Sequence, residues 1–354
     1  MNNELALDDA NLNKYYIVTF GCQMNDRDSQ ALAGILEELG YGPAASPEEA
    51  RIIIHNTCCV RGNAENRLYG HLGNLKPLKD ADPRRIIGVC GCMVQQASER
   101  EKIEKDYPYI DLVFGTHNLH RLPILLQMVN EGQRVIEVWD DSKAGIPEDL
   151  PIRREDPYRA LVTIMYGCNN FCSYCIVPYV RGRERSRKPE DILREIHDLV
   201  ASGVREIMLL GQNVNSYGKD FAEPVPFADL LKEINGVEGL RRIRFTTSHP
   251  KDLSPQLIAA MRDLDKVCEH LHLPVQSGST RILERMNRRY TREHYLQLVK
   301  DLRAAVPEIV LTTDIIVGFP GETEEDFQET VSMVREAGYE GAFTFAYSPR
   351  IGTA

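Results

Sequence analysis

The sequence predicts an α/β protein with two domains: an amino-terminal doubly wound parallel sheet, followed by a partial (βα)6 TIM-type barrel. Two series of apolar strands alternate with amphipathic helices, and such alternation is typical of parallel sheets covered by helices. The stretch Asp140–Pro157 is rich in Asp, Glu, Pro and Arg and has no periodicity, so it predicts a linker over residues 141–157. A chain of 354 residues is long enough for two or three domains with cores of their own.

The first series forms the domain predicted for residues 14–140. Residues 1–13 are polar and acidic, and we expect a disordered lead-in there. The expected strands are Tyr15–Phe20, Arg51–His55, Arg85–Val89, Leu112–Phe114 and Val135–Trp139. The helical patterns between them are Asp28–Leu39, a stretch that ends near Leu75, Gln95–Lys105 and Leu119–Asn130.

The second series forms the barrel predicted for residues 158–354. Its expected strands are Ala160–Met165, Glu206–Leu210, Arg242–Thr247, His270–Pro274, Leu311–Val317 and Gly341–Tyr347. Helices are expected between the strands, for example over Pro189–Ser202 and Glu324–Ala337. Six βα units predict an active site on the loops at the carboxyl ends of the strands. Because the sequence stops just after the sixth strand, we expect a truncated chain.

Three cysteines at the end of the first barrel strand are the strongest chemical signal: Cys168, Cys172 and Cys175. This CxxxCxxC spacing supplies three thiolates, which can hold three irons of a [4Fe–4S] cube and leave the fourth iron open. Such cubes normally take four cysteines, and an open coordination position is typical of catalytic metal sites. The alternative is a zinc knuckle, but zinc usually needs a second cysteine pair or histidines. The nearest downstream histidine, His197, falls in a helical pattern.

Three further cysteines each follow a strand of the first series: Cys22, Cys58 and Cys92. Ligands of open α/β sheets gather outside the carboxyl ends of the strands, and right-handed crossovers bring these ends to one edge. We therefore expect the three thiols to converge on one metal site. For each cysteine alone, the alternative is a small buried hydrophobic residue. The remaining cysteines lack this placement: Cys59, Cys90 and Cys268.

Composition limits the compartment and the partners. No apolar run approaches the ~20 residues of a membrane span, and the polar, acidic start is neither a secretory signal nor a transit peptide. Nine cysteines in such a chain indicate the reducing cytoplasm, and their odd number excludes a complete set of disulfides within one chain. The net charge of −10 disfavours nucleic acid. Three arginine-rich groups nevertheless permit an anionic substrate: 181–188, 241–244 and 281–292.

Both cysteine triplets stand among longer motifs: Thr19–Asn25 (TFGCQMN), Asn56–Cys58 (NTC), Gly91–Cys92, Cys168–Arg187, Leu210–Gly218 (LGQNVNSYG), His272–Gly278 (HLPVQSG) and Asp314–Glu322 (DIIVGFPGE). Through these motifs the chain resembles the radical S-adenosylmethionine (SAM) methylthiotransferases, from about Tyr16 to the last residue. The resemblance is closest to the branch of the family that acts on N(6)-dimethylallyladenosine in tRNA.

The resemblance implies two [4Fe–4S] clusters, SAM and a tRNA substrate. The two triplets would hold the clusters: Cys168, Cys172 and Cys175 the one that cleaves SAM, and Cys22, Cys58 and Cys92 an auxiliary one that carries or activates the sulfur. A methylthio group would be inserted at carbon 2 of the adenosine at position 37, beside the anticodon. Its C–H bond has no acidic proton, so radical chemistry is needed, while the protein supplies position and excludes water.

The resemblance also implies residues that contact SAM at the strand ends of the barrel. Gly211, Gln212 and Asn213 stand where the superfamily binds the methionine amino group, although the usual acidic residue is absent. Further candidates for ribose or adenine contacts are Tyr174, Ser248, Gln276, Val317 and Gly318. Arg183 and Arg187 are candidates for the SAM carboxylate or a substrate phosphate, since arginine binds both groups bidentately. For each, the alternative is an ordinary turn, cap or wall residue.

Several functions remain open from the sequence. Sister enzymes of the family modify threonylcarbamoyl-adenosine in tRNA or an aspartate of ribosomal protein S12, and a non-catalytic iron–sulfur scaffold is a different class. The Gly211–Gly218 block and the Val180–Arg187 run favour the dimethylallyladenosine enzyme, whose base must be splayed out of a single-stranded loop. An electron donor such as flavodoxin or ferredoxin and a sulfur donor are implied partners; no membrane is expected. The family continues into a β-rich RNA-binding domain that this sequence lacks, so we expect weak tRNA affinity.

Overall fold

The computed structural model describes residues 13–59, 62–139 and 145–353, which fall into two compact units. Unit 1 consists of Met1–Glu155 together with the segment Tyr179–Gly182, and unit 2 consists of Asp156–Pro178 and Arg183–Ala354. The predicted lead-in over residues 1–13 lies outside the described residues, apart from residue 13. Among the helices described, none is long and apolar enough to cross a membrane.

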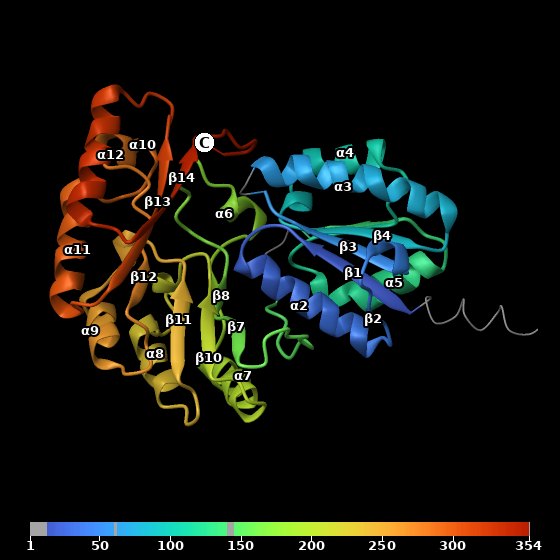
Figure 1. Ribbon diagram of the computed structural model, residues 1–354, viewed down its shortest axis with the longest axis horizontal. Coiled ribbons are helices and arrows are strands. Elements are labelled where there is room, and N and C mark those ends of the chain that lie inside the picture. The colour runs from blue at the N-terminus through green and yellow to red at the C-terminus, as the bar shows by residue number, and fades with distance from the viewer. Residues whose placement is uncertain (1–12, 60–61, 140–144, 354) are drawn as a thin grey trace, which may run out of the picture. The chain divides into compact units, whose positions relative to one another are not determined.

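Unit 1 is built on a six-stranded, fully parallel sheet with the order β2-β1-β3-β4-β5-β6. Its strands are β1 Lys14–Thr19, β2 Gly42–Pro43, β3 Ile52–Thr57, β4 Ile86–Gly91, β5 Leu112–Phe114 and β6 Val135–Glu137. Helices α2 (Gln23–Glu38) and α5 (Leu122–Asn130) cover one face, and α3 (Gly62–Ala81) and α4 (Ala97–Asp106) cover the other (Figure 1). Short 3-10 turns complete the unit: η1 Pro47–Glu49, η2 Met93–Gln95 and η3 Leu119–Arg121.

The central strands of unit 1 are apolar on both sides because both faces of the sheet are covered. Along β3, Ile52 and Ile54 pack with residues of α2 and α5, whereas Ile53 packs with residues of α3 and α4. All six residues of β3 are buried. A parallel strand covered on both faces reads as a continuous apolar run rather than an alternating one. The doubly wound sheet expected for this part of the chain is therefore confirmed.

Unit 2 contains six parallel strands in two three-stranded groups, with the orders β11-β10-β7 and β12-β13-β14. Their bounds are β7 Arg159–Thr163, β10 Glu206–Leu210, β11 Arg242–Thr246, β12 His270–His272, β13 Val310–Val317 and β14 Gly341–Ala346. A parallel bridge between Ile243 and Val267 follows the same direction. The helices are α7 Pro189–Ala201, α8 Phe227–Asn235, α9 Pro255–Asp263, α10 Thr280–Arg285, α11 Arg292–Ala305 and α12 Glu324–Ala337. This arrangement confirms the partial (βα)6 barrel.

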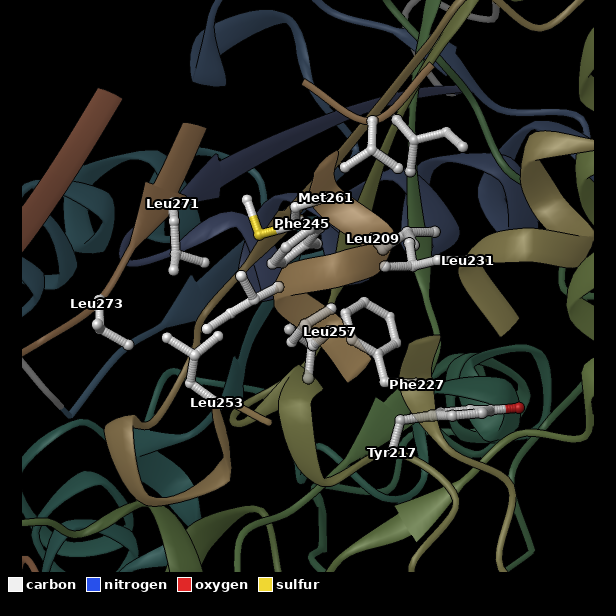
Figure 2. Packing of buried hydrophobic residues seen from close by; sticks show 14 of the residues in the cluster. Leu209, Tyr217, Phe227, Leu231, Phe245, Leu253, Leu257, Met261, Leu271 and Leu273 are labelled. Carbon is white, nitrogen blue, oxygen red and sulfur yellow. The ribbon is translucent and has the colours of Figure 1, made fainter. Parts of the chain in front are cut away.

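One large apolar cluster holds the strands and helices of unit 2 together. Figure 2 shows part of it, with Leu209 of β10 and Phe245 of β11 among side chains from α8 and α9. Phe227 and Phe245 meet edge to face, with ring centroids 5.2 Å apart, an arrangement that aromatic quadrupoles favour. This core fixes the carboxyl ends of the strands, where the candidate site lies.

Several boundaries differ from the sequence prediction for physical reasons. The strand expected at Ala160–Met165 is divided: β7 ends at Thr163, and β8 (Met165–Tyr166) pairs antiparallel with β9 (Arg185–Ser186). Strands of two residues carry too little periodicity to be recognised. Helix α2 begins at Gln23 rather than Asp28, because its polar first turn shows no apolar period. A short helix, α6 (Val177–Val180), was also not predicted.

Candidate functional site

In unit 2, the loop between β8 and α6 carries the first cysteine triplet. Cys168 and Cys172 are buried and Cys175 is partly exposed. The segment after α10 holds this loop in place. Ser173 donates its backbone N–H to the carbonyl of Met286 (3.1 Å). Asn287 donates its side-chain amide to the carbonyl of Phe171 (2.9 Å).

Nitrogen donors lie close to the sulfur atoms of this loop. The amide of Asn170 is 3.4 Å from Sγ of Cys168. The guanidinium of Arg288, itself buried, is 3.6 Å from Sγ of Cys172 and 3.4 Å from the hydroxyl of Tyr174. Donors placed in this way stabilise a thiolate and tune a cluster that it ligates. In the sequence, Arg288 stands out only as a member of the arginine-rich group 281–292, and its contact with Cys172 is not visible there.

Burial makes free thiolates costly in this loop. It raises the pKa of the Cys168 thiol to about 11 and that of Cys175 to about 12. Without a positive partner both groups are therefore protonated at neutral pH. Iron supplies such a charge, since metal binding displaces the thiol proton. The chemistry of the three sulfur donors thus fits an iron–sulfur cluster.

Among the residues that the structure describes, no group of three or more His, Cys, Asp or Glu side chains is arranged to hold a single metal ion. A four-iron cluster needs a wider arrangement than one ion, because each thiolate ligates a different iron atom. The ligand roles of the six cysteines stay predictions.

The carboxyl ends of β10 and β11 carry buried polar atoms for which the described part of the chain provides no hydrogen-bond partner. They are Oε1 of Gln212, Oδ1 of Asn213, both side-chain polar atoms of Asn215, and Oγ of Ser248. Buried polar groups in proteins are nearly always satisfied. A polar ligand with amino, carboxylate and hydroxyl groups would satisfy them, and SAM is such a ligand. Of the residues predicted from the sequence to contact SAM, Gln212, Asn213 and Ser248 therefore fit this group.

Asn213 is oriented by a neighbouring acid that the sequence analysis did not single out. Its Nδ2 donates to Oδ2 of Asp252 over 2.7 Å, and Asp252 also accepts from Lys219 and Lys251, each over 2.6 Å. The preceding Gly211 allows a close approach, because a Cβ there would lie 2.6 Å from Cγ of Met165. Asp252 follows a different strand and lies far from Asn213 in sequence, so no local motif could reveal the pair.

The other predicted contacts are spread over later strand ends. Gln276 follows β12, has a φ of +70° and exchanges backbone hydrogen bonds with β13. Val317 ends β13 and is partly exposed. Gly318 follows it with a φ of +72° and donates its N–H to the carboxylate of Glu322. The loops at all these strand ends lie at one end of a parallel barrel, and a shared site for these residues stays a prediction.

The two arginines suggested for an anionic group differ in their surroundings. Arg187 is buried and donates to the carbonyl of Thr163 (2.7 Å) and to the carboxylate of Glu195 (2.6 Å). Arg183 is exposed and lies over the ring of Phe171, 4.3 Å from its centroid. Arg183 is therefore the more accessible of the two for a carboxylate or phosphate.

In unit 1, the second cysteine triplet lies at the ends of three strands that are neighbours in the sheet. Cys58 directly follows β3, Cys92 directly follows β4, and Cys22 stands shortly after β1. Asn25 lies among them: its Oδ1 is 4.0 Å from Sγ of Cys22 and 3.9 Å from Sγ of Cys92. Its Nδ2 donates to the backbone carbonyls of Phe20 (3.0 Å) and Thr57 (2.8 Å), which ties the ends of β1 and β3 together.

Two glycines allow this close approach of the strand ends. A Cβ on Gly21 would lie 2.7 Å from Cβ of Cys58, and one on Gly91 would lie 2.4 Å from the carbonyl oxygen of Thr57. Both residues have positive φ angles, +132° and +97°, which glycine adopts without strain. The turns around the second cysteine triplet therefore need these glycines.

Arg181 completes the surroundings of the second triplet. Its Nε lies 3.1 Å from Sγ of Cys92. A hydrogen bond from Cys59 and the charge of Arg181 lower the pKa of Cys92 to about 6, against the opposing effect of burial. Cys90, by contrast, is fully buried in the core, and burial raises its pKa.

Known families match both units. Residues 162–334 match the family model of the radical SAM superfamily, and residues 14–115 match that of the uncharacterised protein family UPF0004. The barrel and its three-cysteine loop therefore place the chain among the radical SAM enzymes, which use SAM and a [4Fe–4S] cluster.

Curated relatives identify the family more closely. The tRNA-2-methylthio-N(6)-dimethylallyladenosine synthase of Caldicellulosiruptor saccharolyticus is 56% identical over 354 residues, which are 100% of this chain and 75% of the relative. The protein of the same name from Clostridium perfringens is 58% identical over 337 residues, 95% of this chain and 75% of that protein. The chain belongs to the family of tRNA-2-methylthio-N(6)-dimethylallyladenosine synthases.

Solved structures support the fold. The radical SAM methyltransferase TsrM from Kitasatospora setae, with tryptophan and a SAM analogue bound, has a TM-score of 0.65 at 14% identity, covering 94% of this chain and 72% of that one. The cobalamin-dependent SAM radical enzyme OxsB has a TM-score of 0.63 at 13% identity, covering 94% and 53%. At such identities the likeness concerns the fold alone.

Proposed function

We propose that this chain inserts a methylthio group at carbon 2 of N(6)-dimethylallyladenosine, at position 37 of tRNA. The observation that carries this proposal is the 56% identity over all 354 residues with a tRNA-2-methylthio-N(6)-dimethylallyladenosine synthase. The geometry supports it, because cysteine triplets follow strand ends in both units, and buried polar atoms without a hydrogen-bond partner among the described residues lie at the strand ends of the barrel in unit 2.

Residues of unit 2 would bind and orient the SAM that is cleaved. Cys168, Cys172 and Cys175 would hold a [4Fe–4S] cluster, which supplies when bound the electron for SAM cleavage and hence the radical that takes hydrogen from carbon 2. Gln212, Asn213 and Ser248 would satisfy their buried polar atoms on SAM. The buried Arg288 would fix the positions of the Cys172 and Tyr174 side chains. Asp252 would fix the orientation of Asn213.

Residues of unit 1 would hold an auxiliary four-iron cluster through Cys22, Cys58 and Cys92. This site would carry or activate the sulfur. A sulfur donor and an electron donor such as flavodoxin or ferredoxin are proposed partners. We also propose a cytoplasmic location. The proposed domains span residues 14–140 and 158–354, and the linker between them spans residues 141–157.

The test is a reaction of the purified, anaerobically reconstituted protein with SAM, a low-potential reductant and tRNA that carries N(6)-dimethylallyladenosine. Mass spectrometry should detect 5′-deoxyadenosine and the 2-methylthio nucleoside. The matched control replaces Cys168, Cys172 and Cys175 with alanine and should form neither product. A methylthio product on threonylcarbamoyl-adenosine or ribosomal protein S12 instead would move the assignment to a sister enzyme. Absence of 5′-deoxyadenosine would favour a non-catalytic scaffold.

A further inference from the structure

A buried guanidinium reaches the second cysteine triplet from a distant part of the sequence. Arg181 follows Cys175 by six residues, yet its segment, Tyr179–Gly182, belongs to unit 1. The segment is anchored there, because the hydroxyl of Thr116 donates to the carbonyl of Val180 over 3.2 Å. The side chain of Arg181 is only 5% exposed.

Three groups of unit 1 receive the hydrogens of this guanidinium. Nε points to Sγ of Cys92 at 3.1 Å. Nη2 donates to Oδ2 of Asp28 at 2.7 Å and to Oδ1 of Asn25 at 3.0 Å. The same Oδ1 of Asn25 lies within 4.0 Å of Sγ of both Cys22 and Cys92. Arg181 therefore contacts Cys92 directly and is linked to Cys22 through the side chain of Asn25.

Stability alone is a weak reason for this arrangement. Taking an arginine and an aspartate out of water carries a desolvation cost that their attraction often only balances. The side chain of Asp28 is 9% exposed, so the pair is almost fully removed from water. Such a pair next to sulfur ligands is better explained by its effect on the charge of the site. Net charge and hydrogen bonds to the sulfurs set the potential of an iron–sulfur cluster.

We propose that Arg181 is a positioning residue of the auxiliary site, which donates a hydrogen bond to Cys92 and raises the reduction potential of the cluster held there. Asp28 opposes it and limits the rise. This inference rests on the proposed function, because it requires a cluster on Cys22, Cys58 and Cys92.

Removal of the two charges should shift the midpoint potential of the cluster in opposite directions. Loss of the positive guanidinium destabilises the reduced cluster, which carries one more negative charge, so Arg181→Met should lower the midpoint potential. Loss of the carboxylate charge in Asp28→Asn keeps the shape of the side chain and should raise the potential. A merely structural role for the pair would not produce shifts of opposite sign.

The experiment uses the whole chain with Cys168, Cys172 and Cys175 replaced by alanine, so that the auxiliary cluster is the one observed. Its iron content is measured first, and its potential then by a redox titration followed by electron paramagnetic resonance. We expect Arg181→Met to change the relative stability of the two oxidation states at least tenfold, which is about 59 mV for a one-electron couple. Arg84→Met, at an exposed arginine of unit 1, is the matched control and should not shift the potential.

Each outcome decides the proposal. Opposite shifts in Arg181→Met and Asp28→Asn support it, and equal potentials in loaded wild-type and variant proteins overturn it. If Arg181→Met does not bind iron, Asp28→Asn, which keeps the guanidinium, carries the test by itself. A triple-alanine background without iron would overturn the auxiliary cluster of the proposed function and the inference with it.

Discussion

The guanidinium of Arg288 lies 3.6 Å from Sγ of Cys172 and donates to the carbonyl of Pro274 over 2.7 Å. Its Nε also donates to the hydroxyl of Tyr290 over 2.9 Å. Pro274 stands just after β12. The buried side chain of Arg288 therefore links the cysteine loop to the end of this strand. The position of the loop therefore depends on this arginine.

Replacement of Arg288 by methionine should loosen the cysteine loop. The carbonyl of Pro274 would lose its charged donor, and the free energy of unfolding should fall by about 2–3 kcal/mol, measured by urea denaturation followed by circular dichroism. Formation of 5′-deoxyadenosine should fall with it. Arg289→Met, at the exposed neighbouring arginine, is the control. Unchanged stability and SAM cleavage in Arg288→Met would contradict this role.

Ser248→Ala should weaken SAM binding without destabilising the protein. Its Oγ is buried and has no hydrogen-bond partner among the described residues, so alanine removes no internal bond. Loss of one hydrogen bond to SAM costs about 1 kcal/mol, which is roughly a fivefold rise in Kd, measured by isothermal titration calorimetry.

A second serine of unit 2 gives the reciprocal control. Ser254 caps α9 by accepting from the backbone N–H of Leu257 over 3.1 Å. Ser254→Ala should therefore lower the free energy of unfolding by about 1 kcal/mol and leave the Kd for SAM unchanged. A loss of stability in Ser248→Ala with an unaltered Kd would show that Ser248 does not bind SAM.

Gly91→Ala should disrupt the auxiliary site, whereas Gly88→Ala in the same strand should not. Gly91 has a φ of +97°, and a Cβ there would lie 2.4 Å from the carbonyl oxygen of Thr57. At Gly88 the nearest atom would be 3.5 Å away, an ordinary contact. Iron analysis of the two reconstituted variants should show about half the wild-type iron for Gly91→Ala. Full loading of Gly91→Ala would contradict the need for this turn.

The stability of unit 1 should depend on pH through His55. Burial, and to a smaller extent the charge of His71, lower the pKa of His55 to about 4. A histidine in the unfolded chain titrates near 6.5. The unfolded state therefore binds the proton first as the pH falls. The contribution of neutral His55 is fully present above about pH 6.5 and is lost between about 6.5 and 4, by about 1.4 kcal/mol per pH unit.

His55→Leu should remove this part of the pH dependence. Urea unfolding can be followed by the fluorescence of Trp139, the single tryptophan of the chain, which lies in unit 1. Between pH 7.5 and 5.5 the wild-type protein should lose more stability than the variant. Parallel curves for the two proteins would show that His55 does not contribute.

The sequence predicted several strands and helices well, because apolar patterns are local, and it predicted the buried charges poorly. Leu112–Phe114, Glu206–Leu210 and Glu324–Ala337 were predicted with the bounds that the structure has. The cysteines were found because their spacing and strand-end positions are visible in one dimension. Arg181 and Arg288 stood out only as members of arginine-rich groups, since their burial depends on contacts between distant segments. The same limit applies to Asp252, whose pairing with Asn213 joins the ends of two strands.

The proposed function is tested most directly by a mass-spectrometric census of tRNA nucleosides from a host that lacks this gene, with and without the full-length gene restored. We predict that the 2-methylthio nucleoside disappears, that N(6)-dimethylallyladenosine accumulates, and that restoration reverses both changes. Restoration with Cys168, Cys172 and Cys175 replaced by alanine should not reverse them. An unchanged level of the 2-methylthio nucleoside in the host without the gene would contradict the proposed function.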